Sequence, residues 1–483
     1  MDCNSNQKKK RGWKVVIAGE CMVCRPFSMH EEPEFLKIRD IMLASDVTYA
    51  HLEMNFGDFS TTGWPIRGDC VGSYMLADPA IAKDLRWLGI DIMSLAHNHS
   101  YDFGAPGLLE TIRHCREAGL VCAGTGRDLE EAREPGYWEG AAGRVALVST
   151  ASGNGPYDWA NLSKGAMSAR PGVNPLRVRT RYRLPAAEAE ALRQIGRKLD
   201  VLRMKGMSRE GSTALGLEDG EFRLVMPGDQ SLRGSGVFCE GEDFGIETKC
   251  HERDLEGNLR SIREGREMAD FVMVAHHFNI SEGSRGDVPP AFAREFAHAA
   301  IDSGADVYFG HGWHKTLGIE IYKGKPIFYG LGNFFAQSQF LRRVPYDGYE
   351  SWGHDMDRLP VLNPADEPLH PERERSSETW WSSALIEAEF DAEGHVRSMT
   401  FYPVELGREV SMEVNVTRGT GRKYAEGRPM IAKGENARRI LERLRALSEP
   451  FGTIIEIDGD VGRWKAEPSG GKASANPVGA AKN

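Results

Sequence analysis

Histidine, asparagine and aspartate side chains stand close together in one short stretch of the sequence, SLAHNHSYDFG, residues 94–104. Imidazole nitrogens and carboxylate or amide oxygens bind metal ions, and a histidine beside a carboxylate can transfer protons. The candidates for a metal and proton-transfer site are His97, Asn98, His99 and Asp102. A polar loop between a strand and a helix would have a similar composition, so this stretch does not decide the matter alone.

Similar polar residues follow the other strands that the sequence predicts. These residues are Glu20, Glu53, Asn55, His276, His277, His311 and His314. Loops at the carboxyl ends of parallel strands converge on one edge of a sheet, so we expect these groups to form one composite centre. The mixed ligands predict one or two divalent metal ions, and they do not distinguish manganese, zinc, iron, magnesium or calcium.

The elements that would position this centre alternate between apolar strands and amphipathic helices. Strands are predicted at residues 13–20, 45–55, 91–96, 144–150, 270–279 and 305–314, and helices at 79–90, 106–120 and 289–304. This alternation predicts an α/β fold with parallel β-α-β units. Two further strand pairs are expected around Gly324 and Gly394, followed by a closing amphipathic helix near residues 436–453.

A single domain is expected over residues 14–455, after a basic N-terminal tail at residues 1–13. Residues 152–265 are rich in arginine, glycine and glutamate, and we expect a partly helical insertion there that covers one edge of the site. Residues 456–483 are expected to form a largely disordered C-terminal tail, because the end of the chain is rich in glycine, alanine, serine and lysine.

The composition indicates a globular protein without a basic excess: 483 residues, 27% of them charged, with a net charge of −10. Phosphate recognition needs a basic surface, so we expect a small-molecule or peptide-like substrate and no nucleic acid. Glu20 interrupts the apolar run near the N-terminus, and no apolar run is long enough to span a bilayer. We therefore expect no integral membrane segment and a cytoplasmic location. Cys21 and Cys24 lack a second Cys-x-x-Cys pair and are interpreted as buried thiols.

Many of these stretches resemble the CapA or poly-γ-glutamate capsule-synthesis family, which has a calcineurin-like metallophosphatase fold. The similar segments, in the family's order, are AGE, SDVTYAHLEMN, LGIDIMSLAHNHSYDFGAPGLLETI, AGTGRDLEEAREP, RPGVNPLRV, AHHF, GADVYFGHGWH, GKPIFYGLGNFF and EPFGT. The resemblance covers residues from about 14 to 455. It implies a four-layer α/β/β/α sandwich with its site at the strand ends.

The resemblance also implies roles for individual residues. The implied metal ligands are Glu20, Glu53, Asn98, His276, His311 and His314. His99 matches the histidine that meets a leaving group or a substrate oxygen as an acid, and Asp102 is expected to orient it. Asn333 is expected either near the site or as a cap of a turn.

The sequence departs from the family pattern at several of these positions. Glu20 replaces an aspartate, His97 replaces the first asparagine of Asn-Asn-His, and Trp313 replaces a proline. The pair His277 and Phe278 replaces Trp-Gly. No histidine lies two residues after Glu20, which weakens a phosphoesterase assignment.

Three functions remain open at this point. The first is a metal-dependent hydrolase of an amide or peptide-like substrate related to poly-γ-glutamate, with His99 protonating the leaving atom. The second is a metal-dependent, cofactor-free peptide epimerase, in which His99 or His97 removes an α-proton. The third is a non-catalytic subunit of capsule or envelope polymer biosynthesis.

Two further groups of residues have alternative interpretations. Arg170, Arg177 and Arg179 could bind a substrate carboxylate or could form a solvated charged face. Trp380 and Trp381 are expected in the core rather than at the substrate.

Overall fold

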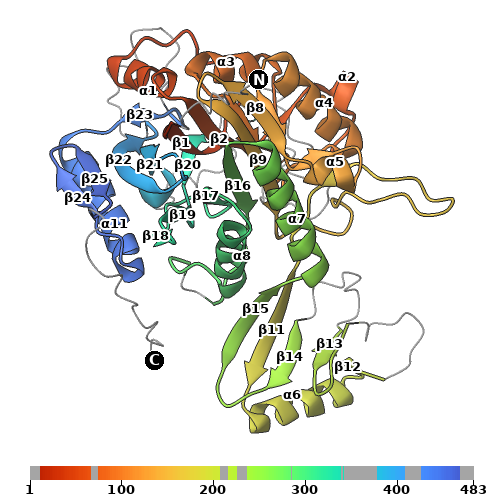
Figure 1. Cartoon of the computed structure of the whole chain (residues 1–483). Coiled ribbons are helices and arrows are strands. Elements are labelled where there is room, and N and C mark those ends of the chain that lie inside the picture. Colours follow the sequence, from red (N-terminus) through yellow and green to blue (C-terminus); the bar gives the residue numbers. More distant parts are fainter. Residues whose placement is uncertain are drawn as a thin grey trace, which may run out of the picture.

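Two β-sheets with helices on their outer faces form the body of the protein (Figure 1). The computed structural model describes residues 11–66, 74–206, 216–225, 236–283, 286–338, 341, 378–407 and 426–467. The α/β class predicted from the alternating sequence pattern is confirmed.

The larger sheet has a parallel half and an antiparallel half. The parallel strands are β1 (Trp13–Met22), β2 (Val47–Leu52), β5 (Ile92–Ser94) and β6 (Val121–Ala123), with β20 (Asn333–Ala336) beside the end of β1. The antiparallel strands are β21 (Ser382–Phe390), β22 (Val396–Glu405), β23 (Met430–Ile431), β24 (Glu456–Asp458) and β25 (Val461–Lys465). The pairing of β1 with β2 shifts register before Glu20, and Glu20 then pairs with His51 on one side and Asn333 on the other. Such irregularities in strand pairing change the direction in which a side chain points.

The smaller sheet contains the strand that ends at His276 and His277 and the strand that ends at His311. Its strands are β8 (Gly136–Gly140), β9 (Gly143–Ala151), β16 (Phe271–His277), β17 (Val307–His311), β18 (Ile319–Tyr322) and β19 (Lys325–Phe328). Strands β9, β16 and β17 are parallel neighbours. The last residues of β16 and β17 are His277 and His311, so the two histidines lie at the same edge of the sheet.

A shared apolar core lies between the two sheets. It contains Ile17 of β1 and Met273 and Ala275 of β16. Successive strand residues point to opposite faces, so Val272 and Val274 of β16 pack on helices instead. The helices on the larger sheet are α1 (Pro33–Leu43), α3 (Ala80–Leu88) and α4 (Gly104–Glu117). The helices on the smaller sheet are α7 (Glu252–Met268) and α8 (Ala291–Asp302). A further helix, α11 (Gly434–Ser448), contacts β22. Within the described residues, no helix is both long and apolar enough to cross a membrane.

A separate five-stranded sheet projects from the body (Figure 1). Its elements are β11 (Val178–Leu184), α6 (Ala186–Lys198), β12 (Leu202–Met204), β13 (Phe222–Leu224), β14 (Val237–Glu240) and β15 (Gly245–Cys250). Helix α6 packs on this sheet through Ala189, which contacts a small core with Leu202 and Phe222. Most of the insertion predicted at residues 152–265 therefore forms this projecting lobe, which spans residues 178–250, whereas α7 belongs to the body.

Residues 456–467 do not form part of a disordered tail, contrary to the prediction for residues 456–483. Strands β24 and β25 form a hairpin, and β25 pairs with β22 so that Trp464 lies opposite Met399. Trp464 packs against the core between the sheets, and this burial stabilises an otherwise polar segment. Residues 1–10 and 468–483 lie outside the described residues.

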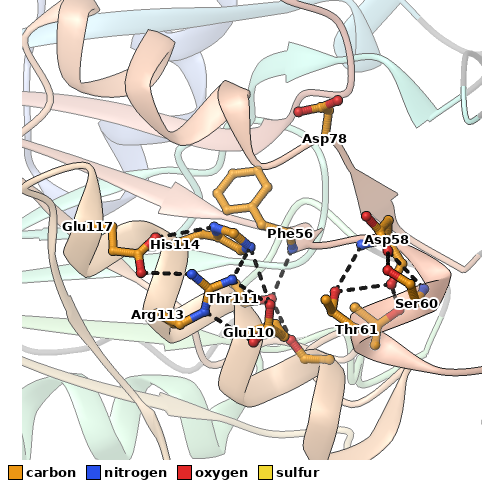
Figure 2. Close-up of polar contacts among 12 residues, drawn as sticks. Phe56, Asp58, Ser60, Thr61, Asp78, Glu110, Thr111, Arg113, His114 and Glu117 are labelled. Atoms are coloured by element: carbon orange, nitrogen blue, oxygen red, sulfur yellow. Dashed lines mark hydrogen bonds and ion pairs between the residues drawn. The ribbon is translucent and has the colours of Figure 1, made fainter.

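Hydrogen bonds attach the segment that follows Glu53 to α4 (Figure 2). The backbone N–H of Phe56 donates to Oγ1 of Thr111 at 2.9 Å. Asp58 caps the next short helix, and its carboxylate accepts from the N–H of Ser60 at 2.8 Å. The remaining short elements are α2 (Phe59–Thr62), α5 (Leu129–Arg133), β3 (Asn55–Phe56), β4 (Leu76–Ala77), β7 (Thr125–Gly126), β10 (Gly172–Val173) and the 3₁₀ turns Glu378–Trp380 and Glu449–Phe451.

A buried ion pair connects the antiparallel half of the larger sheet to α1. The Arg428 side chain is 1% exposed and donates to both carboxylate oxygens of Glu32, at 2.7 and 3.0 Å. Its guanidinium also lies 4.6 Å from the ring centre of Phe35. Burial alone would raise the pKa of Glu32, but the hydrogen bonds and charge of Arg428 lower it to about 2.

Replacement of Glu32 by glutamine is expected to lower the free energy of unfolding at neutral pH by about 1–3 kcal/mol, because Arg428 stays buried without its counter-ion. A carboxyl group with a depressed pKa stabilises the fold above its unfolded pKa of 4.5, and this contribution is lost as the pH falls toward 2. Chemical denaturation of both proteins should therefore show a stability difference that narrows below pH 4.5. An equal difference at pH 7 and pH 3 would contradict this assignment.

Candidate metal centre

Side chains from both sheets meet at the carboxyl ends of their parallel strands. They are Glu20 of β1, His51 of β2, Glu53 just after β2, His277 of β16, His311 of β17 and His314 in the loop after β17. Glu53 belongs to two groups whose ligand atoms lie within 4.8 Å of one another, one with His51 and His277 and one with Glu20 and His314. These histidine and glutamate groups could hold a metal ion.

The two carboxyl groups share His314 as a cationic neighbour. Nδ1 of His314 lies 3.0 Å from Oε2 of Glu20 and 3.7 Å from Oε2 of Glu53. Burial would raise the pKa of Glu20, but His314 lowers it well below 4.5. Burial raises the pKa of Glu53 to about 8, although the charge of His314 opposes this shift. Burial would lower the pKa of His314, but the carboxylates of Glu53 and Glu20 raise it to about 9. Further positive charge would stabilise both carboxylates in their ionised form.

His314 is held in an unfavourable backbone conformation. Its φ of 55° lies in the left-handed region, which costs a non-glycine residue about 1–3 kcal/mol. Nδ1 of His314 lies 3.1 Å from Oδ1 of Asn333, and Nδ2 of Asn333 donates to the carbonyl of Trp380 at 3.0 Å. The ring of Trp380 lies 4.6 Å from that of His314, so Trp380 borders the centre, whereas Trp381 is in the core as predicted.

Three imidazole rings stack beside Glu53. The ring centre of His51 lies 4.3 Å from that of His311 and 5.0 Å from that of His277. Burial lowers the pKa of His311 to about 3 and holds the pKa values of His51 and His277 well below 6.5. The rings are therefore neutral, which is the form of imidazole that binds metals. Nε2 of His277 lies 3.9 Å from Oε1 of Glu53.

Several buried polar atoms at these strand ends have no hydrogen-bond partner. They include Oε2 of Glu53, Oδ1 of Asn98 and Nδ1 of His311. An unsatisfied buried polar atom costs about 1–3 kcal/mol, so such atoms are rare without a ligand. Carboxylate and amide oxygens and imidazole nitrogens are all metal ligands. The residues present therefore fit a divalent cation.

His99 and Asp102 form a hydrogen-bonded pair in the turn after β5. Nδ1 of His99 lies 2.8 Å from Oδ2 of Asp102, which also accepts the backbone N–H of Met75 at 2.9 Å. The Asp102 carboxylate is fully buried, whereas the His99 side chain is 12% exposed. Nδ2 of Asn55 donates to the carbonyl of His99 at 2.8 Å and fixes the turn. The hydrogen bond to Asp102 orients the His99 ring.

His276, which was predicted as a metal ligand, points away from this centre. Its Nδ1 lies 2.7 Å from Oη of Tyr308, and its Nε2 lies 2.8 Å from Oγ of Ser152. Adjacent strand residues face opposite sides of a sheet, so His277 enters the centre instead. The apolar pattern of β16 could not distinguish the two histidines, because the strand is buried on both faces.

His51 is the residue of the centre that sequence reasoning missed. It lies two residues after Tyr49 and two before Glu53, and alternation along a strand places the three on one face. That spacing is the signal that could have identified it. His97 was a candidate in the sequence but not one of the predicted metal ligands, and its ring lies 5.6 Å from that of His51.

The three arginines considered for carboxylate binding have partners within the protein. Arg170 donates to the carbonyl of Trp159 at 2.8 Å. Arg177 donates to Asp254 at 2.5 Å, and Arg179 donates to Glu221 at 2.6 Å. None of these contacts involves a residue of the centre.

Similarity to known proteins extends over most of the chain. Residues 14–338 match the family model described as bacterial capsule synthesis protein PGA_cap. Two uncharacterized proteins of Sinorhizobium fredii, y4sH and y4uA, are each 33% identical over 460 residues, which cover 93% of this chain and 92% of theirs. A probable polyglutamine synthesis accessory protein of Mycobacterium tuberculosis is 26% identical over 57% of this chain and 51% of its own length. The PGA biosynthesis protein CapA of Bacillus subtilis is 42% identical over 18% of this chain and 23% of its own length. The chain therefore belongs to the bacterial capsule synthesis protein family PGA_cap.

Proposed function

We propose that the protein is a metal-dependent hydrolase of an amide or peptide-like substrate related to poly-γ-glutamate. The observation that carries the proposal is that Oε2 of Glu53, Oδ1 of Asn98 and Nδ1 of His311 are buried and have no hydrogen-bond partner. The substrate class comes from the names of the relatives, a PGA biosynthesis protein and a polyglutamine synthesis accessory protein. The two helix-backed sheets would correspond to the four-layer α/β/β/α sandwich of the metallophosphatases.

Glu20, Glu53 and His314 would hold a divalent ion. Oδ1 of Asn98 and Nδ1 of His311 are further donor atoms, and His277 takes the place of His276 as the imidazole beside Glu53. A divalent ion supplies Lewis acidity, which lowers the pKa of a water molecule and polarises a carbonyl group.

His99 would transfer the proton during amide hydrolysis. Asp102 accepts a hydrogen bond from Nδ1 of His99, which orients the ring and stabilises its protonated form. Nε2 of His99 can then deliver a proton to the leaving nitrogen. The full burial of Asp102 keeps this pair in one orientation.

A direct assay tests the proposed reaction. A γ-linked glutamate oligomer and an α-linked glutamate peptide are incubated in deuterium oxide with the protein and Mn²⁺ or Zn²⁺. We expect cleavage of an amide bond in at least one substrate, seen as a new amino group. Deuterium uptake at an α-carbon without cleavage would replace the hydrolase by an epimerase. No change in either substrate, with metal bound, would favour the non-catalytic subunit.

A further inference from the structure

Helix α6 covers one face of the five-stranded sheet in the lobe (Figure 1). Successive residues of a strand point to opposite faces, so the strand pairing identifies the side chains of the other face, which we call the open face. These side chains are Arg179, Arg181 and Arg183 of β11, Arg203 of β12, Arg223 of β13, Val237 and Cys239 of β14, and Glu247 and Lys249 of β15. The open face is therefore mostly basic, in a chain whose net charge is −10.

Two arginines of the open face lie opposite each other without an acidic partner. Arg203 pairs with Arg223 between the antiparallel strands β12 and β13. Arg203 donates to two backbone carbonyls, and neither guanidinium forms an ion pair with a described residue. Like charges directly opposite each other destabilise a sheet. The pKa of Arg223 is lowered by burial and by the charge of Arg179, although Glu221 opposes this shift. A bound anion would stabilise both arginines in their charged form.

The neighbouring arginines of β11 already hold carboxylates, which are partly exposed. Arg181 and Arg183 donate to the two carboxylate oxygens of Glu247, at 2.9 and 2.6 Å. Arg183 also lies 2.7 Å from Oδ1 of Asp243. The side chains of Glu247 and Asp243 are 36% and 70% exposed, and such exposed ion pairs contribute little stability. A ligand with several linked carboxylates can therefore replace them.

A cleft of about 900 Å³ lies where the open face meets the body. Its lining includes Arg181, Arg183, Glu247 and Lys249 of the lobe and Glu282 and Ala291 of the body. Glu282 follows His277 closely in the chain, and its Oε1 accepts from the backbone N–H of Thr248 at 3.1 Å. The N–H of Ser152 donates to the carbonyl of His277 at 2.8 Å, and its Oγ donates to the carbonyl of Leu176, just before β11, at 2.6 Å. Both walls of the cleft are therefore attached to the strand end that carries His277.

The spacing of the arginines matches a ligand with one carboxylate on each unit. Alternate residues of a strand are about 6.6–6.8 Å apart. A γ-linked glutamate unit adds about 6 Å to an extended chain, and carboxylates on one side of an extended α-linked chain are also about 6.7 Å apart. Single-stranded nucleic acid would need aromatic rings on which its bases stack. The aromatic side chains of these strands, Tyr182, Phe222 and Phe238, lie on the face covered by α6.

We propose that the open face binds an acidic polymer with one carboxylate on each unit, through Arg181, Arg183, Arg203 and Arg223. This inference rests on the proposed function for the identity of the polymer, a chain of glutamate units. It adds a substrate-binding surface outside the metal centre. The polymer supplies the counter-ions that Arg203 and Arg223 lack, and it extends along the cleft toward the segment that follows His277.

Fluorescence anisotropy of labelled γ-linked and α-linked glutamate oligomers, read before cleavage is detected, tests this surface in the full-length protein. Three strand spacings separate β12 from β11, about 14 Å, so about three units are needed to contact both pairs of arginines. We expect the affinity to rise at least about 10-fold between a single unit and an oligomer of that length, and to fall as salt is added. Equal affinity at all lengths would overturn the proposal. Tighter binding of a single-stranded oligonucleotide of equal charge would also overturn it.

The double variant Arg203→Gln and Arg223→Gln removes the two arginines without acidic partners. Its matched control is Arg197→Gln and Lys198→Gln, which removes two exposed charges from α6 on the opposite side of the same lobe. We expect the first variant to weaken binding of the oligomer at least about 10-fold and the control to change it less than about 2-fold. If the first variant does not fold, Arg203→Gln is compared with Arg197→Gln. Equal affinity of the compared variants would overturn the proposal.

Turnover separates this inference from the proposed function. We expect the double variant of Arg203 and Arg223 to raise KM for long oligomers about 10-fold relative to the control variant. A wild-type protein that binds oligomers through these arginines but cleaves none would overturn the proposed function alone. Cleavage of long oligomers with the same KM in both double variants would overturn this inference alone.

Discussion

The Glu53→Gln protein is expected to lose its bound metal and to turn over substrate at least about 10³-fold more slowly than the wild type, while keeping its fold. Glu53 belongs to both groups of side chains that could hold an ion. Glutamine has nearly the same shape but lacks the anionic oxygen. The effect on the fold is small because burial raises the pKa of Glu53 to about 8, so the metal-free protein already accommodates an uncharged side chain at neutral pH.

Metal content, turnover and stability to denaturant should be measured for Glu53→Gln beside Glu320→Gln. Glu320 is a suitable control because it is also a shielded carboxylate, which accepts from Tyr329 at 2.6 Å and contacts His298 at 3.0 Å. It belongs to β18 and makes no contact with the centre in the described residues. Full metal content and activity in the Glu53→Gln protein would show that the centre does not depend on Glu53.

The second large effect is expected for the pair of His99 and Asp102. His99→Gln and Asp102→Asn should each reduce turnover by about 10²–10⁴-fold, because we propose that this pair transfers a proton in the rate-determining step. Asparagine at position 102 keeps the shape of the side chain but no longer stabilises a protonated imidazole. Bound metal should stay at the wild-type level, since neither side chain is a proposed ligand. Turnover and metal content are measured on the same preparations.

His114→Gln is the matched control for the His99 variant. His114 is a partly buried histidine on α4, and its Nε2 lies 3.4 Å from Oε2 of Glu110 (Figure 2). It has no proposed role in proton transfer. This variant should keep full turnover. Full turnover in His99→Gln would remove His99 from the mechanism, and loss of metal in that variant would make His99 a ligand rather than a proton-transfer residue.

The body of the fold was predictable because its parallel strands are continuous apolar runs and its helices have one apolar side. The hairpin of β24 and β25 was not predicted, since both strands are short and polar. Ile457 and Trp464 are the side chains of the hairpin that pack against the core. The Gly459-Asp460 pair between these strands is a turn signal that could have indicated it. The lobe contains the helix α6, in keeping with the expectation of a partly helical insertion, but its strand β11 with alternating arginines was not predicted.

The candidate site was less predictable than the fold because it depends on which face of each strand meets the other sheet. Glu20 and His311 could be identified from their positions at strand ends. His276 and His277 are both buried, so their burial pattern gave no information on orientation. His51 stands inside an apolar strand rather than at its end, and only its even spacing from Glu53 connects it with the site.

Elemental analysis of the purified wild-type protein, before and after dialysis against a chelator, tests most directly whether these strand-end residues hold a divalent metal ion. We predict one or two divalent ions per chain, which the chelator removes together with turnover and which added metal restores. A metal-free protein whose activity is unchanged by chelators would contradict the proposed centre.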